Sequence, residues 1–123
     1  LKSIRLMEGF AFTDIVVSLK SSDVLQTLAA YRRMAQVCDY PCHVGVTEAG
    51  LLDSSTVKSS IGIGALLADG IGDTIRVSIT GDPLDEVKVG QLVVGETLHI
   101  VGYDDLVALG FERLPLGPGF DTA

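Results

Sequence analysis

Six side chains suited to chemistry stand in or just after three short apolar runs of this sequence. An ammonium, a guanidinium and several hydroxyls together suit a phosphate group, because Arg offers a planar fork of donors and Lys a compact point charge. A carboxylate held beside them has the reach to transfer a proton. The six residues are Lys20, His43, Thr47, Glu48, Arg76 and Ser78.

The three apolar runs predict β-strands over residues 14–20, 42–47 and 74–80, because each is short and rich in β-branched residues. Between them, apolar residues recur at helical spacing. Strands that alternate with helices are typical of parallel βαβ units. The expected helices cover residues 24–38 behind a cap within residues 21–23, Ser54 or Ser55 to Gly70 with the serine as cap, and Pro83 to Gly90.

Polar residues recur on one face of each expected strand, since side chains alternate across a strand. Helices cover both faces of a doubly wound sheet, so its strands are apolar on both. A barrel instead carries its chemistry at the carboxyl ends of its strands, and a full barrel needs ~250 residues. We therefore expect an α/β chain whose parallel βαβ units form roughly the second half of a TIM-type (β/α)8 barrel.

The second helix contains Gly62 and Gly64, which allow two interpretations. Such glycines usually permit close packing of a helix on a strand. A phosphate loop is the sharper interpretation, but "GIG" alone does not complete any phosphate-loop pattern.

Composition narrows the function classes. The net charge of -7 argues against binding of nucleic acid or an anionic membrane over the whole surface, and no apolar run has the ~20 residues of a membrane span. The two cysteines, Cys38 and Cys42, are spaced C-x3-C, which predicts reduced thiols and a cytoplasmic protein. Neither a disulfide framework nor a metal knuckle is expected from them.

Taken singly, the candidate residues also have ordinary interpretations. Lys20 suits a solvated loop, Arg76 suits a pair with a carboxylate, and His43 suits a structural role. The functional interpretation rests on their convergence at one edge of the sheet.

Four stretches of the chain resemble 4-hydroxy-3-methylbut-2-enyl diphosphate synthase, the reductive enzyme of the non-mevalonate isoprenoid pathway. The likeness runs from about Phe12 to Gly90, and the Thr-Glu-Ala-Gly turn together with "GIGDTIRVS" is its most specific part. The stretches are "DIVVSLKSSD", "HVGVTEAG", "VKSSIGIGALLADGIGDTIRVSIT" and "DPLDEVKVG".

The resemblance implies a TIM-type barrel followed by a smaller domain with a [4Fe-4S] cluster. It implies 2-C-methyl-D-erythritol 2,4-cyclodiphosphate as substrate, opened by two electrons from ferredoxin or flavodoxin. A homodimer is expected, in the cytoplasm or, for a plant-type parent, in the plastid stroma.

The resemblance also suggests roles for single residues. By this likeness Lys20 and Ser78 contact phosphate oxygens, and Arg76 helps to set the charge. Glu48 lies beside the carbon skeleton and serves in proton transfer or in orienting the hydroxyl. Thr47 and His43 complete the substrate-binding set.

The chain departs from the family pattern in two ways. The Cys-Pro-Thr-Cys run and the later Cys that hold the family's cluster are absent, so Cys38 and Cys42 are not assigned to it. Residues 1–90 are expected to form a partial barrel, and residues 91–123 a tail that resembles the domain inserted in the long form of the family. The chain alone is therefore expected to be inactive.

Within that tail, the apolar runs at residues 92–94 and 98–101 read as strands, and residues 103–110 read as a short helix.

Two other interpretations stay open. One is a different phosphate-binding TIM-barrel enzyme, such as a pterin-binding synthase. The other is a half-barrel without catalysis that associates with itself, because exposed sheet edges tend to pair.

Overall fold

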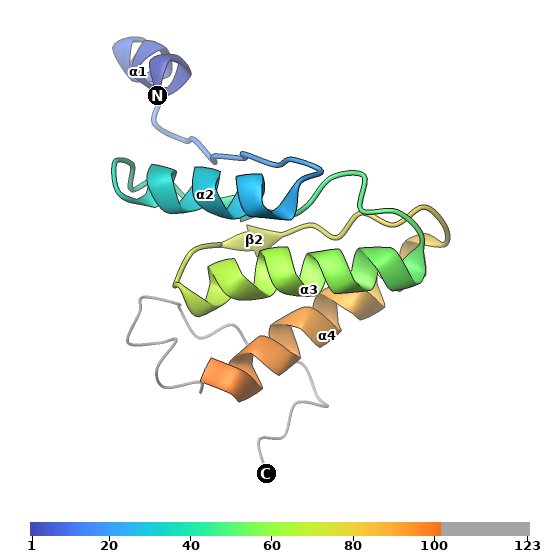
Figure 1. The fold of residues 1–123 in the computed structure, drawn as a ribbon. Coiled ribbons are helices and arrows are strands. Elements are labelled where there is room, and N and C mark those ends of the chain that lie inside the picture. The colour runs from blue at the N-terminus through green and yellow to red at the C-terminus, as the bar shows by residue number, and fades with distance from the viewer. Residues whose placement is uncertain (102–123) are drawn as a thin grey trace.

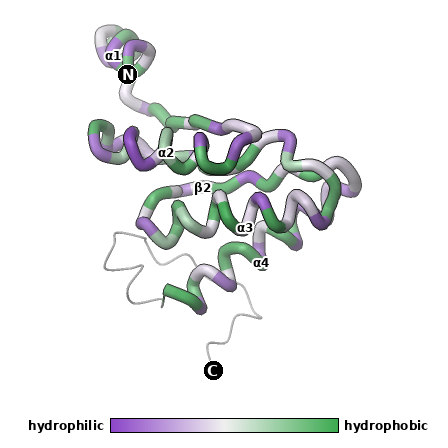
Figure 2. The backbone as a smooth tube through the Cα atoms, viewed as in Figure 1, coloured by the Kyte–Doolittle hydropathy of each residue, from purple (hydrophilic) through white to green (hydrophobic). Residues whose placement is uncertain are grey.

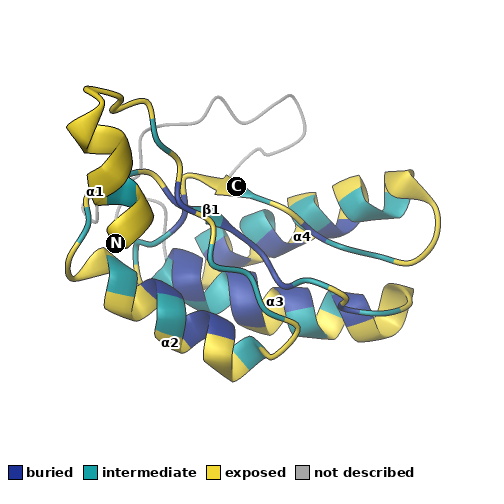
Figure 3. Ribbon diagram, turned by 90° about the horizontal axis from the view of Figure 1, so that it is seen from above, coloured by how far each residue is buried: buried dark blue, intermediate teal, exposed yellow. Residues whose placement is uncertain are grey.

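The computed structural model describes residues 1–101, which form two layers (Figure 1). Figure 3 shows extended segments in one layer and, in the other, the helices α2 (Val24–Ala35), α3 (Leu52–Ala68) and α4 (Pro83–Val101). Helix α3 packs against both α2 and α4. The short helix α1 (Lys2–Gly9) has no buried residue, and it contacts the rest of the chain through Ile4, which packs against the core, and Glu8, which accepts a hydrogen bond from Tyr40. The three connecting helices therefore cover one face of the extended layer.

The extended layer consists of three parallel segments in chain order. Strand β1 (His43–Val44) pairs in parallel with β2 (Thr74–Ile75), residue for residue. The first segment joins β1 through a single parallel bridge between Val17 and Cys42. The predicted α/β arrangement of parallel strands is confirmed, but the regular pairing covers fewer residues than the apolar runs.

The hydrophobic core lies between the two layers. Val17, Val44 and Val77 of the extended segments meet Tyr31 of α2 and Ile63 of α3 there. Figure 2 shows hydrophobic residues recurring both along the extended segments and along the helices that cover them.

Side chains of the first segment alternate between the core and the solvent. Val17 is 6% exposed, whereas its neighbour Val16 is 60% exposed. The predicted separation of an apolar face from a more polar one is therefore confirmed, and burial of one face fixes the position of the other.

The helix ends agree only in part with the sequence patterns. The Asp23 carboxylate accepts a hydrogen bond from the Gln26 N–H at 2.7 Å, so the expected cap of α2 is confirmed. The expected serine cap of α3 is wrong, because α3 starts after Leu51 without a side-chain cap. The serine hydroxyls instead donate to main-chain carbonyls, that of Ser54 to Ala49 and that of Ser55 to Ser78.

The far end of α3 behaves as the sequence predicts. Its cap residue is Asp69, and the next residue, Gly70, has a φ of 77°. A glycine tolerates this left-handed conformation without the steric cost of a Cβ atom.

Helix α4 overturns a prediction for the tail. The strands expected at residues 92–94 and 98–101 are wrong, because α4 continues unbroken to Val101. Val89, Val93 and Thr97 recur at every fourth position and are the buried residues of this helix. Their helical period, and not the local apolar runs, sets the structure.

The junction expected between residues 90 and 91 falls inside α4. The short helix expected over residues 103–110 lies outside the described residues.

Within residues 1–101, no helix combines the length and the apolar character that a membrane span requires.

The two glycines of α3 serve helix packing. A Cβ at Gly62 would come 2.6 Å from Cγ2 of Val46, which is buried in the extended layer. A Cβ at Gly64 would meet the Thr97 hydroxyl at 3.3 Å, on the side of α4. Both positions lie well inside the helix, which favours the packing interpretation over a phosphate loop.

Replacing Gly62 by Ala is expected to lower the free energy of unfolding by about 1–2 kcal/mol, because overpacking against Val46 outweighs the gain in helix propensity. Gly64→Ala is the matched control. It gains the same propensity with a milder contact and should be neutral or slightly stabilising. Urea unfolding followed by circular dichroism measures both variants, and equal stabilisation by the two would contradict close packing at Gly62.

Candidate functional site

The polar face of the extended layer carries its side chains in rows that cross the segments. The recorded pairings, continued in register, bring together residues from all three segments. We term the middle row, Lys20, Gly45 and Arg76, the cation row. The rows are Ser18, His43 and Thr74; then Lys20, Gly45 and Arg76; and then Thr47 with Ser78.

Gly45 lies at the centre of the cation row and is buried. A Cβ at this position would press against the main-chain carbonyl oxygen of Arg76 and would lie 3.4 Å from Cε of Lys20. The missing side chain therefore allows the strands to approach closely. It also leaves the space that the Lys20 side chain occupies as it crosses β1.

The two cations of this row influence each other. Burial lowers the pKa of the Lys20 ammonium, and the Arg76 guanidinium lowers it further. Within residues 1–101, no carboxylate forms a salt bridge with either group. The expected alternative, in which Arg76 pairs with a carboxylate, therefore finds no support in the described part of the chain. Two adjacent cations without a counter-charge favour binding of an anion.

His43 lies beside the cation row. Burial lowers the pKa of its imidazole, and the charges of Lys20 and Arg76 lower it further. The ring Nδ1 lies 2.7 Å from the Thr74 hydroxyl oxygen. The main-chain carbonyl of His43 accepts a hydrogen bond from the Tyr31 hydroxyl at 2.6 Å. This fixed position is compatible both with a structural histidine and with one that contacts a ligand.

Glu48 is exposed on the turn after β1 and has a left-handed backbone conformation with a φ of 51°. A residue with a Cβ atom adopts this conformation at a cost of about 1–2 kcal/mol. The turn is held on both sides, because the Thr47 N–H donates to the Ser21 carbonyl at 3.1 Å and the Thr80 N–H donates to the Gly50 carbonyl at 2.9 Å. Strained conformations held in this way cluster at functional sites.

The structure brings some of the predicted residues together and leaves others apart. Lys20, His43 and Arg76 form one electrostatically coupled group. Among residues 1–101, no hydrogen bond or ion pair connects Glu48 with that group. Thr47 and Ser78 are half-buried at the carboxyl ends of their segments, on the same face.

The two cysteines do not fit an iron–sulfur cluster. Both are free thiols, and burial raises the pKa of Cys42, which disfavours the thiolate that binds iron. Iron–sulfur clusters are held mainly by cysteine thiolates, and two cysteines are too few even for the three that the family pattern supplies. Within residues 1–101, no group of three or more His, Cys, Asp or Glu side chains could hold a metal ion.

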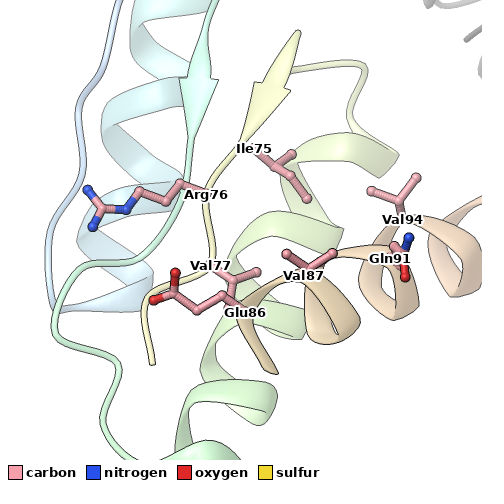
Figure 4. A pocket seen from close by; sticks show the side chains of 8 residues that line it. Ile75, Arg76, Val77, Glu86, Val87, Gln91 and Val94 are labelled. Carbon is pink, nitrogen blue, oxygen red and sulfur yellow. The ribbon is translucent and has the colours of Figure 1, made fainter. Parts of the chain in front are cut away.

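A cavity of about 440 Å³ opens between β2 and α4, and Arg76 is the one member of the cation row that lines it. Figure 4 shows the Arg76 side chain pointing away from Ile75 and the other apolar lining residues. The N–H groups of Thr74 and Arg76 are directed at β1, so the main-chain groups of Ile75 face the other edge of β2. Among residues 1–101 no strand pairs with that edge. The cavity beside it is lined by Ile75, Arg76, Val77, Glu86, Val87, Gly90, Gln91 and Val94.

Two residues that shape the site are not among the six predicted from the sequence. Gly45 stands between two cations in register, which indicates a close approach of the strands. Tyr31 falls at an apolar position of its helix, but a buried tyrosine hydroxyl requires hydrogen-bond partners. That requirement is the signal by which Tyr31 could have been found.

Parallel βαβ units with a cationic face place this chain among the α/β domains of barrel type. The sequence pattern of the GcpE TIM-barrel domain matches residues 1–91. The chain therefore belongs to the GcpE TIM-barrel domain family.

Several curated relatives carry the name 4-hydroxy-3-methylbut-2-en-1-yl diphosphate synthase (flavodoxin). The relative from Geobacter sulfurreducens is 60% identical over 87 residues, which is 71% of this chain and 25% of the relative. That from Caldanaerobacter subterraneus is 58% identical over 94 residues, 76% of this chain and 26% of the relative. That from Clostridium acetobutylicum is 52% identical over 103 residues, 84% of this chain and 28% of the relative. The chain thus spans about a quarter of the length of these relatives.

Gly45→Ala is expected to lower the free energy of unfolding by about 2–3 kcal/mol, because the added Cβ meets main-chain atoms of Arg76 that cannot move aside. Gly81→Ala is the matched control, since its nearest neighbour, Ile79, would be 4.0 Å away. That variant should stay within about 0.5 kcal/mol of the unaltered chain. Chemical denaturation measures both, and a tolerated Gly45→Ala would rule out the close approach in the cation row.

Proposed function

We propose that this chain is the substrate-binding barrel portion of a 4-hydroxy-3-methylbut-2-en-1-yl diphosphate synthase. The observation that carries the proposal is the cation row, in which Lys20 and Arg76 flank Gly45 without a carboxylate partner among residues 1–101. The names of the relatives support it. The proposed substrate is the cyclic diphosphate 2-C-methyl-D-erythritol 2,4-cyclodiphosphate, whose phosphates would bind to this row.

The proposed roles rest on the resemblance to the family, and the positions of the residues are compatible with them. Lys20 and Arg76 bind phosphate oxygens, one as a point charge and the other as a fork of donors. Ser78 adds a hydroxyl at the end of the third segment, and Thr47 with His43 lines the same face. Glu48, presented by the turn that follows β1, orients or protonates the hydroxyl that leaves the carbon skeleton.

We further propose that the chain corresponds to roughly the second half of the barrel. The cavity beside β2 and the outer edge of β2, with which no strand pairs among residues 1–101, support this, because a neighbouring strand of a larger barrel would pair with that edge. The division of the chain into a barrel part, residues 1–90, and a tail, residues 91–123, remains a prediction.

The redox chemistry would lie outside this chain. The residues present do not fit a [4Fe-4S] cluster, so its ligands and the docking of flavodoxin belong to other parts of the proposed whole enzyme. Alone, the chain would bind the substrate's phosphates without turning the substrate over.

A second candidate function is self-association of a barrel segment without catalysis. The edge of β2 that is unpaired within residues 1–101 and the apolar cavity beside it favour this alternative. Light scattering measures the oligomeric state, and thermal unfolding with and without pyrophosphate measures stabilisation by a phosphate ligand. A dimer whose stability does not respond to pyrophosphate would favour the structural role.

Lys20→Ala is expected to weaken the binding of inorganic pyrophosphate to the chain at least tenfold, the loss typical of one hydrogen bond to a charged group. Titration calorimetry measures the affinity. Lys88→Ala is the matched control, because its ammonium lies 3.3 Å from Asp85 on α4. Equal affinities of the two variants would contradict a role of Lys20 in phosphate binding.

Glu48→Gln is best tested in a chimera in which residues 1–91 replace the matching segment of the Geobacter sulfurreducens relative. We expect turnover to fall by about 100-fold or more with little change in substrate binding, because a positioned acid or base contributes about that much. Glu8→Gln is the control, since this carboxylate only accepts a hydrogen bond from Tyr40 at 3.0 Å.

The unmutated chimera must itself turn over the cyclic diphosphate, which tests the proposed activity. Full activity of the Glu48→Gln chimera would remove Glu48 from the mechanism while leaving the proposed substrate class intact.

A further inference from the structure

The hydroxyl of Tyr31 occupies a position where a main-chain hydrogen bond is expected. The Val17 N–H donates to the Pro41 carbonyl at 2.8 Å, and the His43 N–H donates to the Val17 carbonyl at 2.8 Å. In a regular parallel ladder the next bond would join the Leu19 N–H to the His43 carbonyl. Instead, the Leu19 N–H donates to the Tyr31 hydroxyl oxygen at 2.8 Å, and that hydroxyl donates to the His43 carbonyl at 2.6 Å.

This inserted hydroxyl widens the gap between the first segment and β1. Two hydrogen bonds in series span a greater distance than the single direct bond of a ladder. The effect also explains why the pairing of the first segment is reduced to the one bridge at Val17. The opening is local, because the Thr47 N–H donates to the Ser21 carbonyl at 3.1 Å and joins the two segments again just past Lys20.

The tyrosine is firmly held. Its side chain is 0% exposed, and it extends from the middle of α2 into the core. Both of its hydrogen-bond partners are main-chain groups of the candidate site, since Leu19 directly precedes Lys20 and the other partner is His43. The Tyr31 side chain therefore ties helix α2 to both the first segment and β1, which lie on either side of the gap.

We propose that Tyr31 is a positioning residue, whose buried hydroxyl sets the separation between Lys20 and the rest of the cation row and thereby the affinity of that row for a phosphate anion. The inference rests on the proposed phosphate-binding function of the row. Tyr31 itself is buried beneath the row and does not touch the anion.

The decisive variant is Tyr31→Phe, which removes only the bridging oxygen. We expect the affinity for inorganic pyrophosphate, measured by calorimetry on the 123-residue chain, to fall about fivefold to tenfold, the range of one ordinary hydrogen bond. Tyr40→Phe is the matched control, because its hydroxyl bonds to Glu8, remote from the row. It should bind pyrophosphate as the unaltered chain does.

A second readout reports position without any ligand. The chain has two histidines, so proton NMR can follow His43 with His99 of α4 as an internal reference. The imidazole of His43 faces Thr74 of β2 and is influenced by Lys20 and Arg76. If Tyr31→Phe loosens the segment that carries Lys20, the His43 imidazole becomes less buried and is repelled less strongly by the Lys20 ammonium. The pKa of His43 then rises toward its ordinary value.

The outcomes separate the two proposals. Weaker pyrophosphate binding together with a raised His43 pKa supports the positioning role. Unchanged binding and an unchanged His43 pKa in a folded Tyr31→Phe variant overturn it and leave the anion site intact. If even the unaltered chain does not bind pyrophosphate, the proposed function fails, and the His43 titration alone decides the role of Tyr31.

Amide hydrogen exchange measured on the unaltered chain provides a test that does not require the Tyr31→Phe variant to fold. The Leu19 amide should exchange slowly, as an amide bonded to a buried hydroxyl does. Exchange at the rate of an open amide would overturn the inference, whether or not Tyr31→Phe folds.

Discussion

Alternation of side chains along three short parallel segments is the constraint on which the rest of this structure depends. Each segment buries one series of residues under α2, α3 and α4, with Val17, Val44 and Val77 as its members in the core. The remaining series must then project from the other face. Lys20 and Arg76 meet there because their neighbours are anchored in the core, and a shift of one residue in register would exchange the two faces.

The carboxyl end of the third segment is fixed by side chains that approach from the helices. The Ser55 hydroxyl of α3 donates to the Ser78 carbonyl at 2.7 Å, and the Glu86 carboxylate of α4 accepts from the Ile79 N–H at 2.9 Å. Side chains near the start of these two helices thus satisfy main-chain groups where the ladder has ended. The expected serine cap is missing because α3 starts at Leu52, which places Ser54 and Ser55 inside the helix and not at its cap position.

Sequence patterns predicted the elements whose signal is local and periodic. The order of segments and helices, the cap at Asp23 and the closing Gly70 follow from residue type and spacing, as does the polar face that carries Lys20 and Arg76. The strands expected after Gly90 were wrong because short apolar runs do not distinguish a strand from a buried helix. The role of Tyr31 could not be predicted, since it depends on which main-chain groups a tertiary contact brings within reach. For the same reason, the sequence alone does not specify how far Glu48 lies from the cation row.

The electrostatics of the polar face within residues 1–101 favour a ligand of opposite charge. The chain carries a net charge of -7, yet burial and mutual repulsion disfavour the ammonium of Lys20 beside Arg76. A fold selected for stability alone would place one of its many carboxylates between these cations or keep them apart, because adjacent like charges oppose folding. Here the residue between them is Gly45, which adds no charge and leaves space. A phosphate group in that space would offset the repulsion and favour the charged form of the lysine, so ligand binding and the stability of this face would rise together.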